Sequence, residues 1–387
     1  MLIYSYEGLI RADRRSDIVG IRIFHTGDIH IGMTFNSYPA GIRELLKAAR
    51  IEVIERMVKQ ANREGSDLFV IAGDLFDKIK GIDKKTQAAV ADHLSKFEGS
   101  CVAILPGNHD YHTEMVDLWS SFLNFVDDRV MLLTEEKPYD LREYGLDAVI
   151  YPAGCHSKHS KENNLGWFKK MEIDRNLINI GIGHGALSGI SPDLDNQYFN
   201  MGLEELDRIP VDVWLMGHTH ITYPEMDTIK NWKVYNPGTP EPDGLDCKHG
   251  GNAWIVDIHD NREVDAKRVE TGKYSFKDLE FKVNQMEDYS LIQREFKEGT
   301  QNTIARISLK GTIDEEAYRH RLKIREDLEE RLLHLILEDS ELKIRINSDK
   351  IHKEFTKGSF PEQLLLSLQD DEEALQLAYE IISEVRK

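Results

Sequence analysis

The chain has 387 residues, of which 49 are Lys or Arg and 68 are Asp or Glu, so its formal net charge is −19. Apolar residues make up 41% and charged residues 30%, which is typical of a folded globular protein; at roughly 150 residues a domain, the length predicts two or three domains. This composition excludes a disordered or fibrous chain, and the acidic surplus excludes a protein that binds nucleic acid mainly through its overall charge.

The sequence also bears on the cellular compartment. No apolar run approaches the roughly 18 to 20 residues that span a bilayer, so we expect no membrane-inserted segment and no membrane partner. The first twenty residues are charged and lack the apolar core of a secretory signal. We interpret them as an N-terminal extension, a start placed too early, or a short added strand. The three cysteines Cys101, Cys155 and Cys247 form no CxxC motif, which predicts a reducing, cytoplasmic location and excludes a cysteine zinc site.

Residues 21 to about 270 alternate short apolar runs with amphipathic stretches, which predicts a layered α/β domain. The expected buried strands cover residues 21–24, 68–71, 102–105, 178–182 and 211–216. Apolar side chains at three- and four-residue steps predict helices over 42–63 and 86–97. Because Gly, Asp, Asn or His closely follows each strand, we expect a ligand site beyond the carboxyl ends of the strands.

The pattern changes after about residue 275. A strand over 303–309, a charged helix over 314–331 and strands over 332–337 and 342–346 predict a small α+β module. From residue 360, apolar residues recur at helical spacing opposite many acidic ones, which predicts a helical tail. We therefore divide the chain into an N-terminal extension (1–20), a main domain (21–275), the α+β module (276–350) and the tail (351–387).

Five segments near strand ends carry candidate metal ligands. They are HTGDIHIG (25–32), AGDLFD (72–77), PGNHD (106–110), GIGHGA (181–186) and MGHTH (216–220). Together they supply Asp28, His30, Asp74, Asn108, His109, His184, His218 and His220. Carboxylate, amide oxygen and neutral imidazole suit Mn²⁺, Fe²⁺, Zn²⁺ or Mg²⁺, whereas the absence of thiolate argues against a closed structural zinc site.

Two of the candidate pairs of metal ligands are separated by a single residue. The chain must turn between the two ligands of such a pair if both side chains are to reach the same ion. Asp28 and His30 form one such pair and His218 and His220 another, and we expect the flanking glycines Gly27, Gly32 and Gly217 to permit these turns.

Each motif alone has a plainer interpretation. Asp28 could simply orient an imidazole, Asp74 could be a helix N-cap, and residues 107–110 could form an ordinary turn. His184 alone says almost nothing, and the GHTH segment could be a pair of loop histidines. Their conjunction in this order after five separate strands favours a metal site.

The ordered set D-x-H, GD-x-x-D, GNHD, H and GH-x-H resembles the calcineurin-like metallophosphoesterase superfamily over residues 21 to about 260. The resemblance implies a four-layered α/β/β/α sandwich that binds two divalent ions, with Mn²⁺ expected and Mg²⁺, Fe²⁺ and Zn²⁺ as alternatives. It implies the following ligands: Asp28, His30 and His220 for one ion, Asn108, His184 and His218 for the other, and Asp74 bridging both.

The resemblance also suggests catalytic and substrate-binding residues. His109 matches the family position that contacts the scissile phosphate and protonates the leaving oxygen; the alternative is a supporting role paired with Asp110. Asp77 either orients a ligand histidine or begins the following helix. Segment YNPGTPEP (235–242) is similar to the family's phosphate-side loop, so Gly238 and Thr239 are expected to bind substrate.

The opening motif, GDLFD, GNHD and the region beyond residue 275 resemble the bacterial SbcD and YhaO type of DNA repair exonuclease. This implies a DNA exonuclease or endonuclease, a capping module that contributes to DNA contact, and a homodimer. It also implies that the tail binds an SbcC-like ATPase of the SMC family. Asp77 fits the bacterial branch, because archaeal and eukaryotic relatives often carry histidine there. Two alternatives stay open: a small-substrate phosphodiesterase or phosphatase, and a scaffold for an ATPase.

Overall fold

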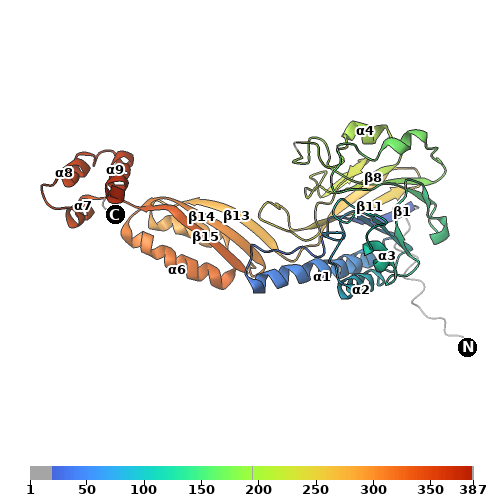
Figure 1. Ribbon diagram of the computed structural model, residues 1–387, viewed down its shortest axis with the longest axis horizontal. Helices are drawn as coiled ribbons and strands as arrows, with labels where there is room; N and C mark the ends of the chain where they lie inside the picture. Colours follow the sequence, from blue (N-terminus) through green and yellow to red (C-terminus); the bar gives the residue numbers. More distant parts are fainter. Residues whose placement is uncertain (1–19, 194, 298, 386–387) are drawn as a thin grey trace, which may run out of the picture. The chain divides into compact units, whose positions relative to one another are not determined.

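The computed structural model describes residues 20–193, 195–297 and 299–385 (Figure 1), so the predicted N-terminal extension lies outside the described residues except for Gly20. The chain forms two compact units, Met1–Ser275 and Phe276–Lys387. No described helix is both long and apolar enough to cross a membrane.

Two sheets form the centre of the first unit. The larger has the strand order β4 (Val130–Leu132), β3 (Cys101–Leu105), β2 (Leu68–Ala72), β1 (Gly20–Thr26), β11 (Asn252–His259), β12 (Val264–Glu270) and β9 (Thr228–Lys230). The smaller has the order β10 (Val234–Tyr235), β8 (Val213–Gly217), β7 (Ile178–His184), β6 (Ala148–Ala153) and β5 (Tyr139–Asp140). Strands β1 to β4 pair in parallel, as do β6, β7, β8 and β10, so each set of carboxyl ends lies along one edge.

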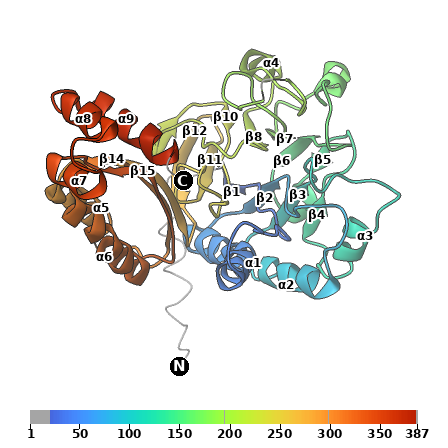
Figure 2. The ribbon, with the colours of Figure 1, turned by 60° about the vertical axis from the view of Figure 1, so that its left-hand side comes forward.

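The first unit is the predicted α/β/β/α sandwich. One apolar core lies between the sheets and includes Val70, Leu105, Ile180 and Leu215. A second core lies under three helices, α1 (Ala40–Glu64), α2 (Lys84–Leu94) and α3 (Leu118–Leu123). A third lies under α4 (Leu203–Arg208) and the 3₁₀ helix Gly166–Lys170. Figure 2 shows α1 to α3 on one side of the paired sheets and α4 on the other.

Local sequence explains these elements. Strands β2 and β3 are apolar throughout and completely buried, as expected for parallel strands covered on both faces. Helix α1 ends at Gly65, whose φ of 68° lets its N–H reach the last helical carbonyls. Helix α2 begins after Asp83, whose side chain accepts a hydrogen bond from the Thr86 amide. The predicted helices and the five predicted strands are therefore confirmed, with shifted ends.

The second unit contains the predicted α+β module. Its sheet has the order β13 (Ser275–Lys282), β14 (Thr303–Ile313) and β15 (His334–Ile344), and α6 (Glu315–Arg331) connects the two parallel strands β14 and β15. The prediction of two strands over 332–337 and 342–346 was wrong. A single strand, β15, runs through the polar residues between them, because several of its side chains face solvent at the edge of the sheet.

The described residues after β15 form three helices, α7 (Ser348–Glu354), α8 (Phe360–Ser367) and α9 (Glu372–Val385), so the helical tail begins at Ser348 and not at residue 351 as predicted. They share a small core of Ile346, Ile351, Phe355, Leu365 and Leu375, on which Ala378, Tyr379 and Ile382 also pack. The apolar stripe predicted for α9 thus mostly faces inward. A different face, formed by Leu377, Ile381 and Val385, is exposed.

Candidate metal centre

All eight side chains predicted to surround metal ions lie together beyond the carboxyl ends of the core strands. Asp28 and His30 follow β1, Asp74 follows β2, Asn108 and His109 follow β3, His184 ends β7, and His218 and His220 follow β8. Burial is high: Asp28, Asn108 and His184 are 0% exposed. Such burial of polar groups requires compensating partners.

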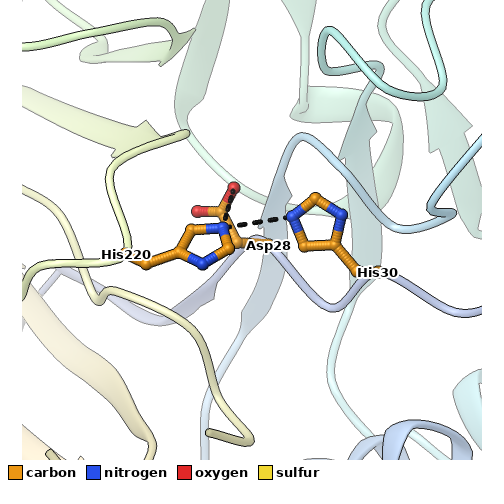
Figure 3. A group of neighbouring side chains, drawn as sticks. All are labelled: Asp28, His30 and His220. Carbon is orange, nitrogen blue, oxygen red and sulfur yellow. Dashed lines mark hydrogen bonds and ion pairs between the residues drawn. The ribbon is translucent and has the colours of Figure 1, made fainter. Parts of the chain in front are cut away.

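One group of donors consists of Asp28, His30 and His220 (Figure 3). The Nε2 atom of His220 lies 3.1 Å from Nε2 of His30 and 3.8 Å from Oδ1 of Asp28. These three side chains come from two loops that are far apart in sequence, and each directs a ligand atom towards the same point.

The second group contains Asp74, His184 and His218, with Asn108 among them. Oδ1 of Asn108 lies 3.1 Å from Nε2 of His184 and 2.9 Å from Nδ1 of His218. The Asp74 carboxylate lies between the two groups, because its Oδ2 is 3.4 Å from Nε2 of His184 and 3.6 Å from Nε2 of His30.

The hydrogen-bond partners of the histidines test whether a cation fits. Nδ1–H of His184 donates to the Ala72 carbonyl at 2.8 Å, and Nδ1–H of His220 donates to Oδ2 of Asp243 at 2.7 Å. In the neutral imidazoles, Nε2 therefore presents a lone pair to neighbours that are themselves acceptors. Lone pairs that converge in this way need a positive charge between them, so the residues fit a divalent cation.

Buried charges shift the pKa values of these groups. Burial alone would lower the pKa of His184, but the nearby Asp74 carboxylate outweighs it and raises this pKa to about 9. Burial, together with the nearby His184, lowers the pKa of His218 to about 3. A cation that binds here must displace the proton of His184, which makes binding weaker at lower pH.

The backbone turns at the donors themselves. Asp28, His30, Asp74 and His218 have φ values of 54°, 51°, 51° and 91°, a conformation that non-glycine residues rarely adopt. The expectation for the glycines holds for Gly32, with φ of 99°, but not for Gly27 and Gly217. A Cβ on Gly217 would lie 1.9 Å from the Ala72 carbonyl oxygen and one on Gly27 3.1 Å from it, so these two glycines permit close approach to β2.

His109 lies at the border of the two donor groups. Its amide donates to Oδ1 of Asp74 at 2.8 Å, and its Nδ1–H donates to the Asp77 carbonyl at 3.0 Å. Its side chain is 32% exposed, which makes it far more accessible than Asp74.

Asp77 does not begin a helix, because α2 starts at Lys84 with Asp83 as its cap, and the same finding removes the N-cap interpretation of Asp74. Oδ1 of Asp77 lies 3.5 Å from Nδ1 of His30 and 3.9 Å from Nδ1 of His109. Nδ1 of His30 has no hydrogen-bond partner among the described residues, so Asp77 lies beside His30 without a hydrogen bond, and its orienting role stays a prediction.

Asp110 is completely buried, and its carboxylate accepts hydrogen bonds from the amides of Phe76 (2.9 Å) and Gly107 (2.7 Å). Burial, with Asp74 nearby, raises the pKa of Asp110 to about 7. The contacts of Asp110 hold the GNHD turn against the loop after β2. They provide no support for a pair between Asp110 and the His109 ring.

Gly238 and Thr239, expected to bind substrate, are buried. The Thr239 hydroxyl lies 3.0 Å from the Asp28 carbonyl oxygen and accepts a hydrogen bond from Arg50 at 3.1 Å. These contacts leave no accessible surface on Thr239 for a substrate. Its contacts instead hold the backbone of Asp28.

Sequence reasoning missed two residues, Asp243 and Arg50. Asp243 accepts a hydrogen bond from His220 and so holds this imidazole in place. Burial alone would raise the pKa of Asp243, but the hydrogen bond with His220 keeps this pKa below its usual range. Arg50 is 1% exposed, donates to the Ile29 carbonyl at 3.0 Å, and has Nη2 4.0 Å from Oδ2 of Asp243. A signal for Arg50 existed, since it occupies the apolar face of α1 between Leu46 and Val53.

Comparison with known proteins gives consistent results. The family model described as calcineurin-like phosphoesterase matches residues 21–222. The chain is 25% identical over 217 residues to the "Uncharacterized metallophosphoesterase YhaO" of Bacillus subtilis (strain 168), which covers 52% of this chain and 49% of that protein. It is 26% identical over 239 residues to the "DNA double-strand break repair protein Mre11" of Methanopyrus kandleri, which covers 57% of this chain and 49% of that protein.

The chain thus spans about half the length of these two curated relatives. Among solved structures, TT1561 of Thermus thermophilus aligns at 15% identity with a TM-score of 0.39, covering 64% of this chain and 98% of that one.

Proposed function

Because this chain belongs to the calcineurin-like phosphoesterase family, we propose that it is a two-metal DNA nuclease, the nuclease subunit of an SbcCD-like DNA repair complex. Membership of the family makes it a metal-dependent phosphoester hydrolase. The similarity to a protein named for DNA double-strand break repair supports DNA as the substrate, with exonucleolytic or endonucleolytic cleavage.

The observation that carries the proposal is the position of Asp74 between the two donor groups, 3.6 Å from His30 and 3.4 Å from His184. Both distances are measured from the same oxygen, Oδ2, while Oδ1 accepts the hydrogen bond from the His109 amide. A carboxylate in this position could contact an ion in each group. When bound, two divalent ions, with Mn²⁺ expected, would lower the pKa of a water and stabilise the attacking and leaving oxygens of an in-line displacement.

The residues of the chain have separate tasks in this reaction. Water attacks phosphorus and releases a proton to solvent, the bond from phosphorus to the 3′ oxygen breaks, and protonated His109 donates a proton to that leaving oxygen. The hydrogen bond of Nδ1 to the Asp77 carbonyl leaves Nε2 of His109 available for this transfer. Asp77 and Asp243 act as positioning residues for His30 and His220, respectively.

The second unit supports a large substrate and a protein partner. A phosphatase or phosphodiesterase for small substrates would leave Phe276–Lys387 without a role. A pure scaffold for an ATPase would not need a complete set of buried donors. We propose that the exposed apolar face of α9, formed by Leu377, Ile381 and Val385, binds an SbcC-like ATPase of the SMC family, and that the protein is a homodimer.

Hydrolysis assays in Mn²⁺ test the proposal. The purified chain is incubated with single-stranded DNA, linear duplex DNA and bis-p-nitrophenyl phosphate, a diester with one phosphate. The nuclease proposal predicts cleavage of both DNA and the small diester. Cleavage of small esters alone would favour the small-substrate alternative, and no hydrolysis by a metal-loaded sample would favour the scaffold.

A further inference from the structure

Two short loops beside the metal centre carry exposed lysines: residues 78–80, with Lys78 and Lys80, and residues 158–161, with Lys158 and Lys161. We propose that these flanking loops bind the phosphates next to the scissile phosphate of a nucleic-acid strand. The proposal rests on the proposed nuclease function and names the surface that would recognise the substrate.

Hydrogen bonds attach both flanking loops to the same turn. Nδ2 of Asn108 donates to the Lys158 carbonyl at 3.3 Å. Nδ1–H of the next residue, His109, donates to the carbonyl of Asp77, which immediately precedes Lys78, at 3.0 Å. Asn108 and His109 are consecutive residues of the turn, with Cα atoms about 3.8 Å apart. Loop 158–161 is therefore bonded to the turn at Asn108, and the chain that leads into loop 78–80 is bonded to it at His109.

A chain of rings makes a second connection between loop 158–161 and the donors. The Tyr198 ring lies with its centroid 5.0 Å from that of His159 and 5.0 Å from that of His218. An isolated bridge between Ser160 and Tyr198 fixes the backbone beside this contact. The position of the loop is therefore tied to the metal centre through two independent contacts.

Several exposed lysines of the first unit, among them Lys84, Lys85, Lys169 and Lys170, form no ion pair with a described carboxylate. By contrast, Lys59, Lys96 and Lys137 are exposed but each forms an ion pair with a nearby carboxylate of the same chain. Lys78, Lys80, Lys158 and Lys161 form no ion pair with any described carboxylate. The four lysines of the flanking loops are distinguished by their position, because hydrogen bonds attach their loops to the turn of Asn108 and His109. In a chain of net charge −19, four uncompensated cations beside a catalytic centre form a local site for an anion.

The arrangement indicates the class of anion. A small ester has a single phosphate, which the metal ions would occupy, and it would leave nothing for cations on both flanking loops to bind. A nucleic-acid strand presents further phosphates on each side of the one being cleaved. Lysines that bind phosphates add affinity without sequence preference and make binding depend on salt.

The test replaces all four lysines by glutamine in the full-length chain. A matched variant, Lys59→Gln, Lys96→Gln, Lys137→Gln and Lys230→Gln, changes the net charge equally at exposed positions away from the flanking loops. Binding of a fluorescent single strand with a phosphorothioate backbone, which slows cleavage, is measured by anisotropy over a range of salt concentrations. Cleavage of an ordinary strand and of bis-p-nitrophenyl phosphate is measured in Mn²⁺.

We expect the flanking-loop variant to bind the strand at least tenfold more weakly and to show a tenfold lower ratio of DNA cleavage to small-diester cleavage. The slope of log affinity against log salt should fall by about 0.7 for each lost contact with a single strand, so by about 2 to 3 in total. The matched variant should keep most of the affinity and the slope. Variants with only one loop changed should show intermediate losses.

Equal affinity and slope in the two quadruple variants would overturn the proposal, as would a wild-type chain that binds no DNA. Failure of the nuclease proposal is a different result: the wild-type chain would bind the strand through these lysines yet leave ordinary DNA uncleaved in Mn²⁺. Metal content and thermal melting of each variant show whether the fold and the ions are intact.

Discussion

The metal centre and the C-terminal helices differ in how strongly a function restricts the sequence. At the metal centre, each donor atom has a fixed direction: His184 is held by the Ala72 carbonyl and His220 by Asp243. On α9 the candidate partner surface consists of Leu377, Ile381 and Val385, exposed apolar side chains without a specific bonding requirement. Ligation therefore leaves a motif in the sequence, whereas docking leaves only a periodicity that packing within the chain produces equally well.

The largest effect is expected at the point where the two donor groups meet. Asp74→Asn removes a negative charge from a carboxylate in contact with both groups, so it should abolish hydrolysis and reduce the number of bound ions. Metal analysis after dialysis and activity on bis-p-nitrophenyl phosphate are the measurements. Full activity in a variant of verified metal content would remove Asp74 from the bridging position.

His109 should separate turnover from ligation. His109→Asn removes the proton donor without removing a donor from either group, so the rate should fall by about a hundredfold to ten thousandfold while both ions remain. Single-turnover DNA cleavage and metal stoichiometry measure the two effects. Loss of an ion in this variant would show that His109 binds metal, as its position beside His30 and Asp74 also allows.

Asp243 should affect metal affinity through His220. Asp243→Asn weakens the hydrogen bond that orients the imidazole, and losing such a partner typically lowers metal affinity about tenfold to a hundredfold. Titration calorimetry with Mn²⁺ measures the change. Asp246→Asn, an exposed position in the same loop, is the control, and equal effects of the two variants would assign the change to loop charge.

The exposed face of α9 should affect only the partner. Leu377→Glu with Ile381→Glu should leave the melting temperature and small-diester hydrolysis unchanged while co-purification with the ATPase is lost. Leu375→Ala, in the core of the tail, is the contrast, because it should lower the free energy of unfolding by about 2 to 5 kcal/mol. Undiminished co-purification of the double variant would exclude this face as the docking surface.

The sequence predicted those features whose signal is local. Strands β2 and β3 are continuous apolar runs, and the donors follow them directly, so both could be read from short segments. Strands β9 and β10 have three and two residues and too few positions for any periodicity. Asp243 could not be predicted because it lies outside the five motifs and meets His220 only through the fold of the loop that carries it. The inward face of α9 depended on packing against α7 and α8.

The central claim is that two ions bind on either side of Asp74. Anomalous scattering from a crystal of the full-length chain soaked in Mn²⁺ tests it most directly. We predict two peaks about 3.5 to 4 Å apart, one beside Asp28, His30 and His220 and the other beside Asn108, His184 and His218. A single peak, or peaks away from Asp74, would contradict the two-metal account.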